Sequence, residues 1–198
     1  MAIDLSYWDH VNPNEFLQGV AEGYDKPVRK QYREILQSLQ PKTMLEVGCG
    51  PGVDFIGAVN TCPSIQYTGV DITEQMVQYC RQHYSAGLFY QANIFQLPFE
   101  SGQFEFVYCK DVLNHVDEWP KAFTELLRVS QKYVLVNFFH GLGVKTVKQR
   151  IDHNSYINNY YDWNEVMSTM VSLKPKGLSI YHFPSPSQDD TLILFYKN

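Results

Sequence analysis

The fold of this chain is decided by one stretch, Leu45-Glu46-Val47-Gly48-Cys49-Gly50-Pro51-Gly52. Residues 43–47 are typical of a short buried strand, and the glycines that follow force a tight turn before a helix that begins at Val53. Because Gly48 and Gly50 carry no Cβ, a ligand can approach the backbone closely there. The N-terminus of the next helix offers unpaired N–H groups and a partial positive charge. The stretch therefore predicts a site for a nucleotide-like ligand with a polar or anionic tail.

A second strand is predicted over residues 65–70 and is followed by Asp71. In doubly wound folds, a carboxylate about 20 residues beyond the glycine loop binds the diol of a ribose. The glycine pattern departs from the dinucleotide fingerprint, because Val53 stands where a third glycine is required. Glu46, at the end of the first strand, is also unusual for a dinucleotide site.

Four motifs in register resemble those of the class I S-adenosylmethionine-dependent methyltransferases: residues 45–52, residues 69–72, residues 93–99, and residues 104–107 with 112–116. They lie between residues 40 and 140. The resemblance implies S-adenosyl-L-methionine as the cofactor and a seven-stranded sheet with one reversed strand. The Leu-Pro-Phe motif at residues 97–99 argues, with Val53, against a nicotinamide oxidoreductase.

Predicted strands and helices alternate along the chain after an irregular segment, residues 1–25. Helices are predicted over residues 26–39, 53–59, 73–84, 118–130 and 162–173, and strands over residues 43–47, 65–70, 88–92, 104–109, 133–138, 178–183 and 191–196. This alternation predicts an α/β fold: three layers, doubly wound, with a mostly parallel sheet. The short link between the last two strands predicts an antiparallel last strand.

The length of 198 residues fits a single domain. Within this methyltransferase domain, residues 1–198, we expect an N-terminal lid and helix over residues 1–40. Residues 41–140 are expected to form the cofactor-binding core. Residues 141–198 are expected to form an acceptor-side segment and the C-terminal strand pair.

The net charge is −5 and the pI is about 5.6, which argues against nucleic acid as a partner because such binding needs a basic surface. The four cysteines form no C-x-x-C pair, so no metal site is indicated. No apolar run approaches the length of a membrane span, and residues 1–9 are too polar for a signal peptide. A cytoplasmic location is therefore expected.

The resemblance, together with position, assigns ten residues to the cofactor: Glu46, Gly48, Gly50, Asp71, Ile72, Met76, Asn93, Ile94, Cys109 and Lys110. Asp71 would accept hydrogen bonds from the ribose, and Ile72 and Ile94 would sandwich the adenine. In the family an acidic residue usually meets the adenine amino group where Asn93 stands, and an amide oxygen can also accept that bond. A plain turn at the glycines and core packing of the isoleucines remain the alternatives.

Two histidines, His140 and His115, are the candidates for a catalytic general base. His140 follows the strand predicted over residues 133–138, and Gly141 and Gly143 would let the chain turn away and leave the imidazole facing the pocket. A purely structural histidine is the alternative at both positions. A neutral amine would need no base, so a dedicated base is optional.

Six residues are candidates for the acceptor site: Tyr7, Trp8, Tyr24, Asp111, Tyr156 and Tyr160. The N-terminal aromatic residues could form a lid over the cofactor or fasten the N-terminus to the core. Residues 153–163, rich in Tyr and Asn, could wall an acceptor pocket or form a polar surface loop packed on the last helix.

The expected function is S-adenosylmethionine-dependent methyl transfer to O or N of a small-molecule acceptor. Base and glutamine methylation are disfavoured, because the Asn/Asp-Pro-Pro-Tyr/Phe motif that serves such nitrogens in the family is missing after the fourth strand. A peptide or protein methyltransferase and a non-catalytic protein that binds S-adenosylmethionine are the alternatives. The residues give no acceptor identity and no oligomeric state.

Overall fold

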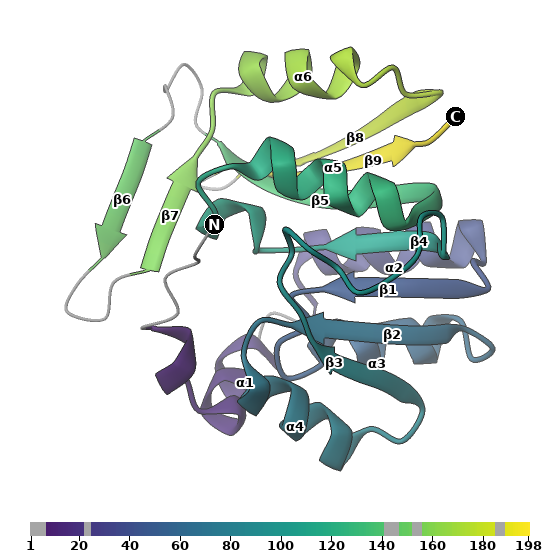
Figure 1. Ribbon diagram of the computed structural model, residues 1–198, viewed down its shortest axis with the longest axis vertical. Helices are drawn as coiled ribbons and strands as arrows, with labels where there is room; N and C mark the ends of the chain where they lie inside the picture. Colours follow the sequence, from purple (N-terminus) through teal and green to yellow (C-terminus); the bar gives the residue numbers. More distant parts are fainter. Residues whose placement is uncertain (1–6, 22–24, 141–146, 152–155, 185–188) are drawn as a thin grey trace.

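A seven-stranded sheet forms the centre of the computed structural model, which describes residues 7–21, 25–140, 147–151, 156–184 and 189–198 (Figure 1). The order across the sheet is β3 (Gly87–Gln91), β2 (Gln66–Asp71), β1 (Thr43–Val47), β4 (Phe104–Cys109), β5 (Ser130–His140), β9 (Asp189–Tyr196) and β8 (Gly177–Phe183). The pairs from β3 to β5 are parallel, whereas β9 runs antiparallel to both of its neighbours. The mostly parallel sheet with an antiparallel last strand is thereby confirmed.

Helices cover both faces of the sheet and make the three layers. One face packs against α2 (Pro27–Leu39), α3 (Val53–Thr61) and α4 (Glu74–His83), and the other packs against α5 (Trp119–Val129) and α6 (Trp163–Ser172). Side chains alternate across a strand, so the neighbours Met44 and Leu45 enter different cores. Trp119 and Phe123, four residues apart on α5, enter the same core because they share one helix face.

The N-terminal segment is more regular than predicted. It forms a short 3-10 helix, η1 (Trp8–His10), and a helix, α1 (Pro13–Ala21). Asn12 caps α1, because its Oδ1 accepts hydrogen bonds from the backbone N–H groups of Asn14 at 2.9 Å and Glu15 at 3.3 Å. The prediction of an irregular segment over residues 1–25 is therefore wrong for residues 8–10 and 13–21. Tyr24 lies outside the described residues.

A two-stranded antiparallel hairpin, β6 (Val147–Ile151) and β7 (Tyr156–Tyr160), stands beside the main sheet (Figure 1). The sequence analysis predicted no strands between β5 and α6. Strand β7 of the hairpin packs against a second 3-10 helix, η2 (Leu113–His115), which follows β4. The Tyr161 hydroxyl donates a hydrogen bond to the Leu113 carbonyl oxygen at 2.6 Å and so fastens the end of β7 to η2.

Candidate functional site

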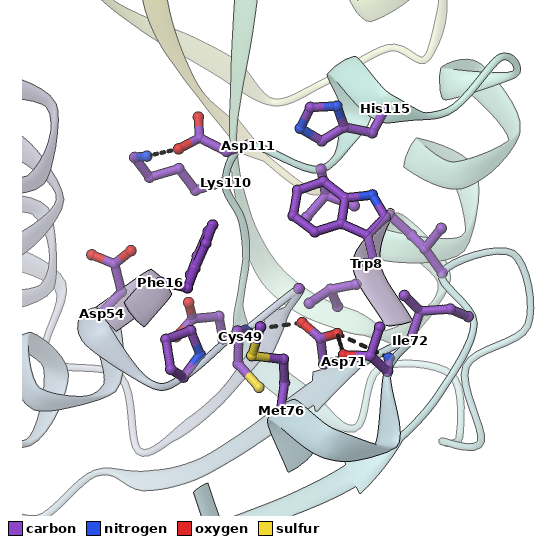
Figure 2. Close-up of a pocket in the computed structure, with 18 of the residues that line it drawn as sticks. Trp8, Phe16, Cys49, Asp54, Asp71, Ile72, Met76, Lys110, Asp111 and His115 are labelled. Carbon is purple, nitrogen blue, oxygen red and sulfur yellow. Dashed lines mark hydrogen bonds and ion pairs between the residues drawn. The ribbon is translucent and has the colours of Figure 1, made fainter. Parts of the chain in front are cut away.

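A cavity of about 450 Å³ opens at the carboxyl ends of β1, β2, β4 and β5 (Figure 2). Ligands bind at this edge in doubly wound sheets, and a cavity of this size suits a small molecule. The N-terminal segment and the β6–β7 hairpin complete its wall: Trp8 contributes from the former and Asn158 from the latter.

The glycine loop passes along the cavity with three residues in the left-handed region, at φ 80° for Gly48, 49° for Gly50 and 86° for Gly52. Glycine adopts these values without steric strain. The backbone N–H groups of Gly48 and Cys49 both donate to the Val70 carbonyl oxygen, at 2.8 and 2.9 Å. Because these donors are engaged within the protein, the loop offers a ligand close approach rather than free N–H groups.

Asp71 lines the cavity and holds the glycine loop against the end of β2 (Figure 2). Its Oδ2 accepts the backbone N–H of Gly50 at 2.9 Å, and its Oδ1 accepts the backbone N–H and the hydroxyl of Thr73, each at 3.0 Å. Burial raises the pKa of Asp71, and these hydrogen bonds oppose that rise. A carboxylate offers about four acceptor positions, so room remains for a donor from a ligand.

An ion pair that the sequence analysis missed lies at the edge of the cavity. Arg29 Nε contacts Asp54 Oδ1 at 3.0 Å, and each residue exposes less than a tenth of its surface. Nearby, Glu46 accepts a hydrogen bond from the Tyr67 hydroxyl. Burial, reinforced by the charge of Asp54, raises the pKa of Glu46 well above its usual value.

A second polar cluster follows β4. Lys110 forms an ion pair with Asp111, a non-glycine residue at φ 56°. The Asn137 side chain fixes Asp111, because its Oδ1 accepts the Asp111 N–H at 2.6 Å and its Nδ2 donates to Asp111 Oδ1 at 2.7 Å. Burial would raise the pKa of Asp111, but the charge and hydrogen bond of Lys110, with the Asn137 hydrogen bond and the charge of Arg29, hold that pKa below its usual value. Strained, over-determined backbone of this kind gathers at functional sites.

Aromatic side chains face one another across the open side of the cavity. The ring of Trp8 lies 5.2 Å from that of His115, 5.0 Å from that of Tyr7 and 6.3 Å from that of Phe16, measured between centroids (Figure 2). Gln75 on α4 holds this segment in place, because its Nε2 donates to the carbonyl oxygens of Trp8 and Val11, both at 2.9 Å.

Twelve of the candidate residues line this one cavity: Glu46, Gly48, Gly50, Asp71, Ile72, Met76, Ile94, Lys110, His115, Tyr7, Trp8 and Asp111. Asn93, Cys109 and Tyr160 do not line it. Asn93 Oδ1 accepts the Phe95 N–H at 2.9 Å, and Cys109 is fully buried in the core. The side chain of Tyr156 lies outside the described residues.

His140 does not face the cavity, contrary to the prediction. Its strand is longer than predicted, because β5 pairs with β9 as far as His140. Side chains alternate along a strand, so Phe139 lines the cavity while the His140 ring lies 4.8 Å from that of Trp163 on α6. A hydrogen bond of 2.6 Å joins His140 Nε2 and Thr191 Oγ1. His115 is therefore the candidate base that reaches the site.

The cavity also includes residues that the sequence analysis did not select, among them Phe16, Arg29, Asp54, Val112, Phe139 and Asn158. Arg29 could have been found from the sequence, because it lies three residues before Tyr32 and so on the buried face of a predicted helix. Asp54 resembles an ordinary first-turn carboxylate. Asn158 belongs to residues 153–163, the stretch that the sequence analysis named as a possible wall of an acceptor pocket without singling out this residue.

Comparison with known proteins agrees with this geometry. A family model described as a methyltransferase domain matches residues 45–135. The chain is 25% identical over 133 residues to an O-methyltransferase of Aspergillus nomiae, covering 64% of this chain and 57% of that protein. It is 24% identical over 179 residues to a malonyl-[acyl-carrier protein] O-methyltransferase of Legionella pneumophila, a match that covers 85% of this chain and 60% of that protein. The chain thus spans less than two thirds of the length of these relatives.

Among solved structures, magnesium protoporphyrin IX methyltransferase from Synechocystis PCC 6803, crystallised with S-adenosylmethionine, is similar in fold, with a TM-score of 0.67 at 16% identity. The match covers 100% of this chain and 99% of that one. The sheet order, the glycine loop and the cavity at its carboxyl edge define a Rossmann-like ligand-binding fold. Residues 45–135 match the family model of a methyltransferase domain, and the chain shares the fold of a methyltransferase crystallised with S-adenosylmethionine.

No helix within the described parts of the chain has the length and apolar character needed to cross a bilayer.

Proposed function

We propose that this protein transfers a methyl group from S-adenosylmethionine to an oxygen or nitrogen atom of a small-molecule acceptor. The observation that carries the proposal is that the glycine loop, Asp71, His115 and Trp8 line a single cavity, with the Trp8 ring 5.2 Å from that of His115. The names of the two relatives, both O-methyltransferases, support an oxygen acceptor.

The residues of the cavity suit the cofactor. Gly48 and Gly50 would allow its amino-acid part to lie against the backbone, and Asp71 would accept hydrogen bonds from its ribose. Ile72, Ile94 and Met76 offer apolar contacts for the adenine. Acidic side chains outnumber cationic ones on the wall: Glu46, Asp54, Asp71 and Asp111 against Arg29 and Lys110. This balance favours a ligand with a net positive charge, such as a sulfonium compound.

When bound, the cofactor would supply an activated methyl group on its sulfonium. The chain's own residues then have to orient an acceptor and exclude water, and orientation alone can lower a barrier by about 7–11 kcal/mol. Trp8 and Phe16, which both line the cavity, would shield the acceptor from solvent. The His115 imidazole, beside Trp8, can take the proton of an acceptor hydroxyl.

The same proposal divides the chain by role. Residues 1–40 act as lid and first helix, residues 41–140 bind the cofactor, and residues 141–198 supply the acceptor side and the last strand pair. We also infer that the protein works in the cytoplasm. The four cysteines within the described residues are all free and buried, which suits a reducing compartment.

Isothermal calorimetry with S-adenosylhomocysteine and with NAD tests the cofactor. We expect S-adenosylhomocysteine to bind and Asp71→Ala to weaken it roughly 10- to 100-fold, because charge-assisted hydrogen bonds contribute about 1.5–3 kcal/mol each. Glu74→Gln, an exposed carboxylate three residues along, is the matched control and should bind as the parent does. Binding of NAD alone would overturn the cofactor assignment.

Turnover is tested separately, by incubating the protein with isotopically labelled S-adenosylmethionine and cell extract and following label by mass spectrometry. We expect label in small molecules. Label only in peptides or proteins would favour a protein methyltransferase. Cofactor binding with no transferred label would favour a non-catalytic binding protein.

A further inference from the structure

Asn158 on β7 is a buried amide that lines the cavity and is only 8% exposed. Its Nδ2 donates to the Tyr160 hydroxyl at 3.4 Å, whereas its Oδ1 accepts no hydrogen bond from any residue that the structure describes. An unsatisfied buried acceptor costs about 1–3 kcal/mol, so native structures keep few of them without a reason. A ligand that donates a hydrogen bond would satisfy this oxygen.

The position of Asn158 is fixed by its neighbours on the same strand. Asn159 Nδ2 donates to the Val116 carbonyl oxygen at 3.0 Å, and the Tyr161 hydroxyl donates to the Leu113 carbonyl oxygen at 2.6 Å. Both acceptors flank His115 in the segment after β4. These hydrogen bonds fix the Asn158 amide relative to the wall that carries His115, the candidate base. A side chain that recognises a ligand needs a fixed position of this kind.

Apart from His115, the wall formed by the N-terminal segment, residues 112–116 and the end of β5 is apolar and aromatic. The side chains that contribute there include Tyr7, Trp8, Val112, Val116 and Phe139. The charged groups of the cavity come instead from the glycine-loop side and from the end of β4. A site with apolar walls and one precisely placed polar atom fixes the orientation of a largely apolar ligand.

We propose that Asn158 determines acceptor specificity: its Oδ1 accepts a hydrogen bond from the hydroxyl group of a small aromatic acceptor molecule. This inference rests on the proposed function, because it concerns the acceptor half of the same cavity. Flat aromatic molecules match the aromatic walls, and a hydroxyl supplies the donor that the Asn158 oxygen lacks. A site of this kind rejects the analogue without the hydroxyl, because the buried oxygen then stays unpaired.

Phenol and toluene provide a matched pair of probes, since they have nearly the same size and shape and only phenol donates a hydrogen bond. Binding of each is measured by NMR titration of the protein saturated with S-adenosylhomocysteine. Toluene is the more hydrophobic, so hydrophobicity alone predicts that toluene binds more tightly. We expect the opposite order, with phenol bound at least about fivefold more tightly.

The variant Asn158→Leu removes the acceptor oxygen at similar volume and should abolish the preference for phenol without weakening toluene. Asn158→Ala is the second variant and should do the same. Asn60→Leu, an exposed asparagine on α3, is the control and should keep the preference. Affinity for S-adenosylhomocysteine should be unchanged in all three.

Equal affinity for the two probes, binding of neither, or a phenol preference that survives both Asn158 variants would overturn the inference while leaving the proposed function intact. Failure of the parent protein to bind S-adenosylhomocysteine would instead overturn the proposed function, and the acceptor assignment with it.

Discussion

Gly48 and Gly50 occupy the same loop, and a methyl group added at each would meet different surroundings. A Cβ on Gly48 would lie 2.1 Å from Val112 Cγ2, so the Val112 side chain would have to move. A Cβ on Gly50 would meet only the Phe16 ring, at 3.9 Å, which is ordinary contact. The protein without ligand therefore has space for a methyl group at residue 50 and not at residue 48.

Gly50→Ala is expected to fold and to lose cofactor affinity. The left-handed φ of 49° should cost about 1–2 kcal/mol of unfolding free energy for alanine. The added methyl group occupies space beside the cavity, so affinity for S-adenosylhomocysteine should fall at least tenfold. Urea unfolding and calorimetry measure the two effects.

Gly52→Ala is the matched control for this substitution. Its φ is also positive, its Cβ would lie 2.5 Å from the Tyr84 ring, and Gly52 does not line the cavity. It should cost more stability than Gly50→Ala and leave the affinity of the folded protein unchanged. If Gly50→Ala bound as tightly as the parent, the loop would not be the surface that the cofactor approaches.

At the scale of elements, the Gln75 side chain on α4 joins the N-terminal segment to that helix by two hydrogen bonds. Gln75→Glu keeps the shape but replaces the donor amide with a carboxylate facing two carbonyl oxygens. Loss of two hydrogen bonds, each contributing about 0.5–1.5 kcal/mol, should release the segment. Limited proteolysis within residues 7–21 should become roughly 5- to 100-fold faster.

Gln78→Glu makes the same chemical change on the exposed face of α4, where Gln78 contacts only Glu74 among the partners that the structure describes, at 3.3 Å. Its proteolysis should match that of the parent. S-adenosylhomocysteine should protect the segment in the parent and in Gln78→Glu, and much less in Gln75→Glu. Equal cleavage rates in all three proteins would remove the lid from the proposed function.

The two strands that the sequence did not predict, β6 and β7, depend on tertiary contacts for their stability. The β6–β7 strands are only five residues each, and β7 contains two asparagines, which have low strand propensity. β7 depends on η2, reached through Asn159 and Tyr161. By contrast, β5 is apolar almost throughout its centre, as a strand covered on both faces must be, and was predicted from that alone.

Across the whole molecule, a polar cluster joins the end of β4 to β5 and β9. Asn137 Nδ2 donates to Asp111 Oδ1 at 2.7 Å and to Asp190 Oδ1 at 3.2 Å. Burial, together with the charge of Asp111, raises the pKa of Asp190 to about 6, while Lys110 and Lys26 oppose the rise. The folded protein therefore binds a proton at Asp190 under conditions where the unfolded chain has released it.

This difference sets the sign of a pH effect on stability. A folded-state pKa above the unfolded value contributes stability at low pH, and that contribution is lost as pH rises from about 4 to about 6. Asp190→Asn keeps an oxygen to accept from Asn137 and removes the titration. At pH 8 it should be more stable than the parent by about 1–3 kcal/mol.

Urea unfolding at pH 5 and pH 8 measures this prediction, with Glu100→Gln, an exposed carboxylate, as the control. The difference in stability between Asp190→Asn and the parent should be larger at pH 8 than at pH 5. A difference that is the same at both pH values would mean that Asp190 does not titrate in this range.

The sequence predicted the sheet and the glycine-loop half of the cavity, because both follow from local patterns: buried strands, glycines at a turn and a carboxylate at a strand end. The other half was predicted only in part, because its residues come from residues 7–29 and from β7, on either side of the matched range 45–135. Trp8 was a candidate from its position in the aromatic N-terminal segment, whereas Arg29 resembles an ordinary helix residue until the fold brings it to the cavity. His140 was misplaced because the length of β5 is set by its partner β9.

The segment that contains the β6–β7 hairpin connects two residues with fixed positions, His140 at the end of β5 and Asp162 at the start of α6. β5 ends at His140, paired with β9, and Asp162 caps α6 by accepting the Glu165 N–H at 3.0 Å. Each doubling of a connection's length changes its closure free energy by only about 0.6 kcal/mol, so a change in the length of this connection should have little effect on the sheet. On the proposed assignment of the acceptor side to this segment, changes in its length could alter which acceptor is bound while the pocket around the glycine loop stays the same.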